Sequence, residues 1–316
     1  MTTGARERPT RSRPPSMSRS AAYAMLTGAV VFWGASFVAT KLLLLELPPP
    51  LLVTARFAIG TGLLGATLVA RGSLRGLTKK DVAPTALLGF LGITLHQWLQ
   101  ANGLQTTSAS VSSWIVATTP IFVALLGWLI LHEHLKGLRG LGILVAALGM
   151  TTVISRGDLG GLLRGRSWLP GDGLMLLSAV NWAVFTVLSK RLLDRGLPAG
   201  ATRDRSIRLM FYVLAFGLLF CLPWLAMEGG QPIVWPLSPQ GWWSLAVLGV
   251  ACSGFSYLFW YAALEVVDAT QVGAFLYLEP VVTSLVAFPV LGEPISTSLL
   301  IGGAGIVLGL WLVNRT

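Results

Sequence analysis

The chain has 316 residues, of which 54% are hydrophobic and only 11% are charged, and its mean hydropathy is +0.72. A soluble domain usually carries about 25% charged residues, so this composition excludes a water-soluble fold of this length and predicts a protein embedded in a lipid bilayer. The formal net charge of +10 does not indicate nucleic-acid binding, because the Lys and Arg residues stand in short stretches between apolar runs and form no basic face.

Residues 1–21 are rich in Arg, Pro, Ser and Thr and show no apolar periodicity, which predicts a disordered tail. The apolar run that follows, from about Ala22 to Leu45, has no convincing small-residue cleavage site. We therefore expect a membrane helix here and not a signal peptide that is removed.

An α-helix needs about 20 apolar residues to cross the hydrocarbon core of a bilayer. Ten runs meet this condition, so the sequence predicts an all-α integral membrane protein with ten transmembrane helices. The predicted spans are 22–44, 50–70, 83–103, 109–131, 138–155, 172–193, 207–227, 241–263, 269–291 and 297–314.

The basic residues between these runs indicate how the chain lies in the cytoplasmic membrane. Under the positive-inside rule, both termini are expected in the cytoplasm. The residues assigned to this side are Arg71, Arg75, Lys79, Lys80, Lys136, Arg139, Lys190, Arg191, Arg195, Arg203, Arg205, Arg208 and Arg315. Arg156, Arg164 and Arg166 form a local exception on the opposite side.

The two halves of the chain resemble each other at regular spacings. Trp33 and Lys41 recur at an offset of 149 residues as Trp182 and Lys190. At an offset of 160 residues, Leu88-Gly89 recurs as Leu248-Gly249, Pro120 as Pro280, Glu133 as Glu293, Gly142 as Gly302 and Gly149 as Gly309. We interpret these matches as a duplication, with repeats at 22–156 and 171–315. Each repeat has five helices, an odd number, so the copies are expected to be inverted around a central site.

Several segments resemble the EamA-like branch of the drug/metabolite transporter superfamily. They are Trp33 to Lys41 (WGASFVATK), Leu104 to Ala109 (LQTTSA), Thr119-Pro120 with Glu133, and Leu278-Glu279-Pro280 with Gly292-Glu293. The resemblance covers nearly all of residues 22–315 and implies a transporter, most commonly one that exports amino acids or related metabolites. The longer segment from about Asp194 to Arg208 departs from the family, as does His132, where the family more often has Gly.

Pro120 and Pro280 fall near the middle of the predicted fourth and ninth helices. Proline lacks an N–H and disturbs the bond to the carbonyl four residues earlier, at Val116 and Leu276. These carbonyls either face a cavity or find partners in a packed kink, such as neighbouring threonine hydroxyls.

Glu279 is the one acidic residue that we expect near the bilayer centre. An intramembrane carboxylate is costly and usually faces a cavity or a partner, and burial favours its protonated form. Glu279 is therefore predicted either to carry a coupling proton or to pair with a cationic group of the substrate. The alternative is a structural group that is hydrogen-bonded between helices.

Trp33 and Trp182 are expected at mid-membrane depth, where they either line a central cavity or pack in the core. Lys41 and Lys190 would attract an anionic group at each gate, or extend to the membrane interface. The remaining candidates for substrate binding are Gln97, Ser113, Trp114, Tyr257 and Tyr277. Hydrogen bonds between helices would explain some of these without a ligand.

The leading interpretation is a secondary transporter that moves a small organic metabolite by alternating access, with protons as a candidate coupling ion. No ATP-binding, dinucleotide or metal motif is found, so no cofactor is predicted. The alternatives are an integral membrane enzyme, such as a group transferase, and an exchange-only facilitator. An enzyme would need acid, base or metal-binding residues gathered near one membrane surface.

Overall fold

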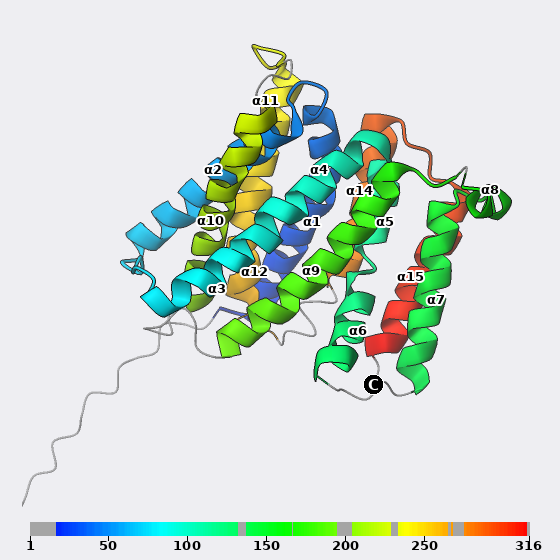
Figure 1. The fold of residues 1–316 in the computed structure, drawn as a ribbon, viewed down its shortest axis with the longest axis horizontal. Helices are drawn as coiled ribbons and strands as arrows, with labels where there is room; N and C mark the ends of the chain where they lie inside the picture. Colours follow the sequence, from blue (N-terminus) through cyan, green and yellow to red (C-terminus); the bar gives the residue numbers. More distant parts are fainter. Residues whose placement is uncertain are drawn as a thin grey trace, which may run out of the picture.

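The computed structural model describes residues 17–131, 137–165, 167–194, 204–228, 233–264, 267 and 275–314, and every regular element in these ranges is a helix (Figure 1). The elements are α1 (Arg19–Leu43), α2 (Pro49–Ala70), α3 (Lys79–Gly89), η1 (Phe90–Leu95), α4 (His96–Thr106), α5 (Ala109–Val116), α6 (Thr119–Leu131), α7 (Gly137–Ile154), α8 (Leu159–Leu163), α9 (Pro170–Asp194), α10 (Arg205–Glu228), α11 (Pro239–Ala246), η2 (Val247–Phe255), α12 (Ser256–Leu264), η3 (Phe275–Leu278), α14 (Glu279–Leu291) and α15 (Thr297–Asn314).

Each apolar run predicted from the sequence coincides with a helical segment, as far as the described ranges extend. Six of these segments are long and apolar enough to cross a membrane: Arg19–Leu43, Pro49–Ala70, Lys79–Thr106, Pro170–Ser189, Ile207–Glu228 and Pro239–Trp260. Shorter apolar helices cover Ala109–Val123, Gly140–Ile154, Phe275–Leu291 and Thr297–Leu312. The short helix α8 was not predicted. The number of ten membrane crossings stays a prediction.

Large apolar side chains cover the outside of the helix bundle. Leu144 and Leu148 of α7 are 56% and 60% exposed, Phe288 of α14 is 57% exposed, and Leu300 and Ile301 of α15 are both 62% exposed. Soluble proteins rarely show apolar surfaces of this extent. Lipid tails cover such a surface without cost, so the exterior agrees with an integral membrane protein.

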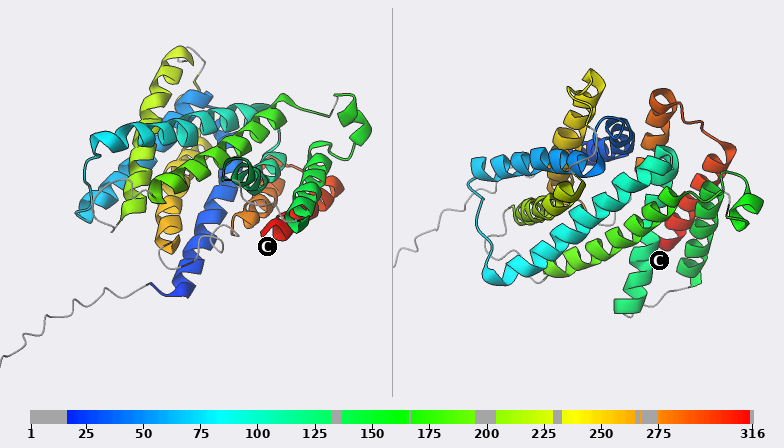
Figure 2. Two further views of the ribbon diagram at one scale, coloured as in Figure 1. Left: turned by 60° about the horizontal axis from the view of Figure 1, so that its bottom comes forward. Right: turned by 45° about the horizontal axis from the view of Figure 1, so that its top comes forward.

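Helices from the first and second halves of the chain interleave. α1 lies against α12 and α14, α2 lies against η2 and α10, and α9 lies against α4 and α6. Figure 2 shows α4 running alongside α9 and α7 alongside α15. A first core contains Phe57 of α2 and Leu214 of α10, a second contains Ile115 of α5 and Ile306 of α15, and a smaller third contains Leu26 of α1 and Ala263 of α12. A site between these helices is therefore built from both halves.

Glycines bring α7 and α15 into backbone contact. A Cβ atom on Gly149 would lie 2.6 Å from the carbonyl oxygen of Gly302, and a Cβ atom on Gly302 would lie 2.6 Å from that of Gly149. A Cβ atom on Gly309 would lie 2.5 Å from the carbonyl oxygen of Gly142. These four glycines therefore allow the two helices to pack closely.

Contacts between connecting segments gather at two opposite ends of the bundle. At one end, the Asp204 carboxylate before α10 accepts hydrogen bonds from Arg71 at 2.8 Å and from Ser73 at 2.7 Å, both of which follow α2. At the other end, the Glu46 carboxylate after α1 accepts from the backbone N–H of Ser238, before α11, at 2.7 Å. The first end is the lower edge of Figure 1, where α1 begins and α15 ends.

Candidate functional site

Trp33 of α1 is joined to the second half of the chain. Its Nε1 donates a hydrogen bond to the carbonyl oxygen of Cys252 in η2 at 3.1 Å. Its ring centroid lies 5.5 Å from that of Tyr257 and 5.1 Å from that of Trp260, both in α12. The structure thus brings the candidates Trp33 and Tyr257 into one aromatic cluster, next to a π-helical stretch of the kind that is frequent at functional sites.

Trp182 of α9 forms a second aromatic cluster, against the first half of the chain. Its ring centroid lies 4.6 Å from that of His96 in α4 and 4.7 Å from that of Phe185. Asn181, the preceding residue, donates through Nδ2 to the carbonyl oxygen of Leu91 in η1 at 2.7 Å. The two tryptophans therefore occupy similar settings, since each packs on a helix of the opposite half that contains a π-helical stretch.

Arg56 of α2 connects helices of both halves. Its side chain is only 7% exposed. Its Nε donates to Ser253 Oγ in η2 at 3.2 Å, and its Nη1 donates to Gln97 Oε1 in α4 at 3.3 Å. Gln97, a candidate from the sequence, is therefore one of two side chains that accept hydrogen bonds from this buried guanidinium.

The sequence reasoning missed Arg56, although a signal was present. A lone arginine inside the apolar run 50–70 is an intramembrane ionisable residue, which by itself is a reason to expect a functional site. The same argument singled out Glu279.

Glu279 is the first residue of α14, at the point where this helix crosses α1. A Cβ atom on Gly34 would lie 2.8 Å from the Glu279 carbonyl oxygen, and Thr283 Oγ1 donates to the Gly34 carbonyl oxygen at 2.8 Å. Within the described ranges, the Glu279 carboxylate accepts no hydrogen bond, and it belongs to neither the Arg71–Asp204 nor the Arg156–Asp172 ion pair. The backbone of Glu279 thus lies against α1 at Gly34, the residue after Trp33.

Pro120 and Pro280 each occupy the second position of a helix, α6 and α14. The predicted fourth helix is in fact two helices, because α5 ends at Val116 and α6 begins at Thr119. Proline in the first turn of a helix loses no hydrogen bond. Thr119 Oγ1 donates to the Val116 carbonyl oxygen at 2.6 Å. This hydrogen bond is the partner expected of a packed kink, and the cavity at these prolines stays a prediction.

Ser113, Trp114 and Tyr277 lie in the second core. Ser113 Oγ donates to the carbonyl oxygen of Ser110 at 2.8 Å, and Trp114 Nε1 donates to Ser284 Oγ of α14 at 3.3 Å. Tyr277 is partly buried against the same core. The hydrogen bonds described here for Ser113 and Trp114 involve neither Trp33 nor Arg56.

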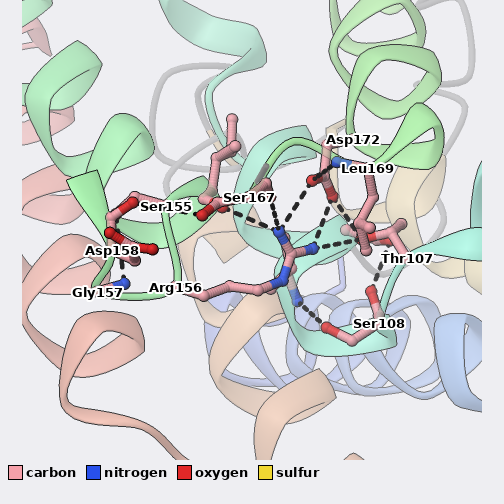
Figure 3. Close-up of polar contacts among 12 residues, drawn as sticks. Thr107, Ser108, Ser155, Arg156, Gly157, Asp158, Ser167, Leu169 and Asp172 are labelled. Atoms are coloured by element: carbon pink, nitrogen blue, oxygen red, sulfur yellow. Dashed lines mark hydrogen bonds and ion pairs between the residues drawn. The ribbon is translucent and has the colours of Figure 1, made fainter. Parts of the chain in front are cut away.

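A buried acidic group organises the end of the bundle where α4, α7 and α9 meet (Figure 3). The Asp172 side chain is fully buried and accepts hydrogen bonds from the Leu169 N–H at 3.0 Å and from the Thr107 hydroxyl. Nη1 and Nη2 of Arg156 each donate to this carboxylate at 3.1 Å. The sequence reasoning treated Arg156 only as an exception to the charge rule, and it missed Asp172.

Lys41 and Glu293 extend this network towards α5. Lys41 Nζ donates to the Thr107 carbonyl oxygen and interacts electrostatically with Glu293. The Glu293 carboxylate accepts from the backbone N–H groups of Ala109 at 2.7 Å and Ser110 at 2.9 Å, at the N-terminus of α5. Glu293, which follows α14, thus joins the end of that helix to the start of α5. Its counterpart Glu133 lies outside the described residues, as does the side chain of Lys190.

Two surface hollows lie at the Glu46 end of the bundle. The larger, about 330 Å³, is apolar and is lined by residues that include Leu51, Trp235 and Trp242. The smaller, about 280 Å³, follows the α1–α2 connection past Glu46 and Gln105. Neither is lined by the tryptophans at positions 33 and 182, so the central cavity stays a prediction.

Comparison with known proteins identifies the family to which this chain is similar. The model of the EamA-like transporter family matches residues 20–155 and matches again over residues 169–315. An uncharacterized transporter of Archaeoglobus fulgidus is 29% identical over 296 residues, which cover 93% of this chain and 98% of that protein. The uncharacterized transporter YyaM of Bacillus subtilis is 27% identical over 289 residues, 91% of each chain. One solved crystal structure has the same fold, with a TM-score of 0.62 at 22% identity, and the match covers 93% of this chain and 96% of that one.

Proposed function

The chain belongs to the EamA-like transporter family and is a multi-pass membrane protein, and from this premise we propose that it is a secondary transporter that moves a small organic metabolite across the cytoplasmic membrane by alternating access. The proposed cargo is an amino acid or a related compound, and the proposed direction is export. No ATP-binding motif occurs in the sequence, so an ion or substrate gradient would drive transport.

The setting of the two tryptophans carries this proposal. Trp33 packs on η2 and α12 of the second half, and Trp182 packs on α4 of the first half. Arg56 contacts Gln97 from one half and Ser253 from the other. Rocking of one half against the other would break and remake these contacts, which is what alternating access requires of a central site.

The contacts between α7 and α15 support the inverted arrangement of two five-helix repeats. Gly302 is the repeat counterpart of Gly142, and Gly309 is that of Gly149. Gly149 contacts Gly302, and Gly142 contacts Gly309. If each glycine in the first contact is replaced by its repeat counterpart, the result is the second contact. A two-fold axis between the helices would produce this reciprocity. The family match over two separate ranges agrees with the duplication.

Reconstitution tests transport directly. The purified protein in liposomes is expected to move one or more members of a panel of amino acids and related metabolites without altering them. Trp33→Leu should reduce uptake strongly, whereas Trp243→Leu, at a side chain that is 72% exposed, should leave it unchanged. Chemical conversion of a panel member without movement would instead establish an enzyme and overturn the proposal.

Glu279 is the proposed site of proton coupling or of pairing with a substrate cation. An imposed pH gradient is expected to accelerate uptake by the unmodified protein, and Glu279→Gln should abolish this acceleration because an amide cannot carry the proton. Glu228→Gln, at the end of α10, serves as the control. Uptake by Glu279→Gln with unchanged rate and unchanged pH dependence would exclude both roles.

A further inference from the structure

Arg56 is a buried cation whose hydrogen-bond acceptors are neutral. Its guanidinium bonds to a serine hydroxyl and to a glutamine carbonyl oxygen, and its Cζ lies 4.9 Å from the ring centroid of Phe57. Arg56 is absent from the ion pairs Arg71–Asp204 and Arg156–Asp172 of the described ranges. No carboxylate of the described chain therefore neutralises Arg56.

The position of Arg56 makes this missing counter-charge significant. Arg56 stands seven residues after the start of α2, which corresponds to about 10 Å along the helix axis. Ser253 and Gln97 hold its side chain against η2 and α4. Arg71, just after the same helix, has a 46% exposed side chain and pairs with Asp204. A buried charge without a partner is costly, and a ligand that carries a negative charge would remove that cost.

The guanidinium retains one donor edge for such a ligand. The contacts to Ser253 and Gln97 use Nε and one N–H of Nη1, and Nη2 has no hydrogen-bond partner among the described residues. The Nη1–Nη2 edge of an arginine matches the two oxygens of a carboxylate in a bidentate pair. Ser253, which accepts from Arg56, follows Cys252, whose carbonyl oxygen accepts from Trp33, so the Trp33–Tyr257 aromatic pair contacts the same stretch of η2 as this charge.

We propose that Arg56 anchors the negatively charged group of the substrate, and that the substrate class is small carboxylic acids with an apolar or aromatic body, amino acids included. This proposal rests on the proposed transport function, since it assigns a substrate class to that central site. Gln97 and Ser253 act as positioning residues that orient the guanidinium.

Matched acids and amides test the proposal on the unmodified protein. The probes are leucine against leucinamide and 3-phenylpropanoate against 3-phenylpropanamide, with inorganic phosphate as a different anion. Binding is measured by thermal stabilisation in detergent, and transport by uptake into liposomes. The acid of each pair is expected to bind at least about 10-fold more tightly than its amide, because the amide cannot form the charge-assisted pair.

Variants at position 56 assign this preference to its residue. Arg56→Gln should weaken acid binding about 10- to 100-fold and leave amide binding unchanged, and Arg56→Lys should retain part of the acid preference. Arg71→Gln, which removes a more exposed arginine near the same helix, should change neither. If Arg56→Gln does not fold, Gln97→Leu is used, and a smaller loss of the acid preference is expected.

Several results would overturn the anion anchor. Equal binding of acid and amide, stronger binding of phosphate than of every carboxylate, or no binding of any carboxylate would each do so. Transport of neutral solutes in the same liposomes would then leave the transport function standing. Conversely, Arg56-dependent binding of acids without movement of any solute would support the anchor and refute transport.

Discussion

Replacing Gly149 by alanine tests the close packing of α7 against α15. The added Cβ atom would lie 2.6 Å from the carbonyl oxygen of Gly302, whereas ordinary contacts begin at 3.4 Å, so the helices must separate locally by about 0.8 Å. The obstacle is backbone, which cannot rotate away as a side chain can. Overpacking of this kind costs about 1–3 kcal/mol, while alanine regains about 0.5–1 kcal/mol of helix propensity.

Gly140→Ala is the matched control, because Gly140 lies in the same helix and a Cβ atom there would meet nothing within 4 Å. The control variant gains the propensity term without the clash. The difference in the free energy of unfolding between the two variants is therefore the packing cost alone, about 1–3 kcal/mol. At about 2–4 °C per kcal/mol, Gly149→Ala should melt several degrees below Gly140→Ala.

The melting temperatures can be read with a thiol-reactive fluorogenic dye in mild detergent. Cys221 and Cys252 are free and buried, so they become reactive only when the bundle opens. If Gly149→Ala melts at or above Gly140→Ala, the helices are not in backbone contact, and the reciprocal glycine contacts offered in support of the inverted repeat lose their basis.

The remaining predictions concern the two ends of the bundle. Asp172→Asn should lower the free energy of unfolding by about 2–3 kcal/mol. This loss is smaller than for a fully buried ion pair, because the Arg156 side chain is 33% exposed. An unchanged melting temperature would contradict a structural role for the pair. Glu293→Gln should cost about 1 kcal/mol through loss of charge at the N-terminus of α5, which denaturant unfolding would measure. In intact cells, a membrane-impermeant maleimide should label Leu163→Cys, 89% exposed, but not Ser73→Cys before lysis; the reverse pattern would invert the proposed orientation.

Much of the fold follows from features that the sequence displays directly. A helix in lipid must satisfy its own backbone hydrogen bonds and present apolar side chains, so composition and run length determine where helices form. The positions of the apolar helices and the close approach at Gly149 and Gly302 were predictable for this reason. Glu293 was predictable as a loop-bonding residue because a carboxylate at a helix end has few other roles.

The site depended on the tertiary structure. Nothing local distinguishes Trp114, which packs in a core, from Trp33, which meets Tyr257 and Trp260, because their neighbours come from more than a hundred residues away. Two interpretations of the Val116 carbonyl were open in the sequence, and the structure supplies a donor for it, the Thr119 hydroxyl. Arg56 is visible in the sequence as a charge in an apolar run, but the identity of its partners, and hence its lack of a counter-ion among the described residues, was decided by how α2 meets α4 and η2.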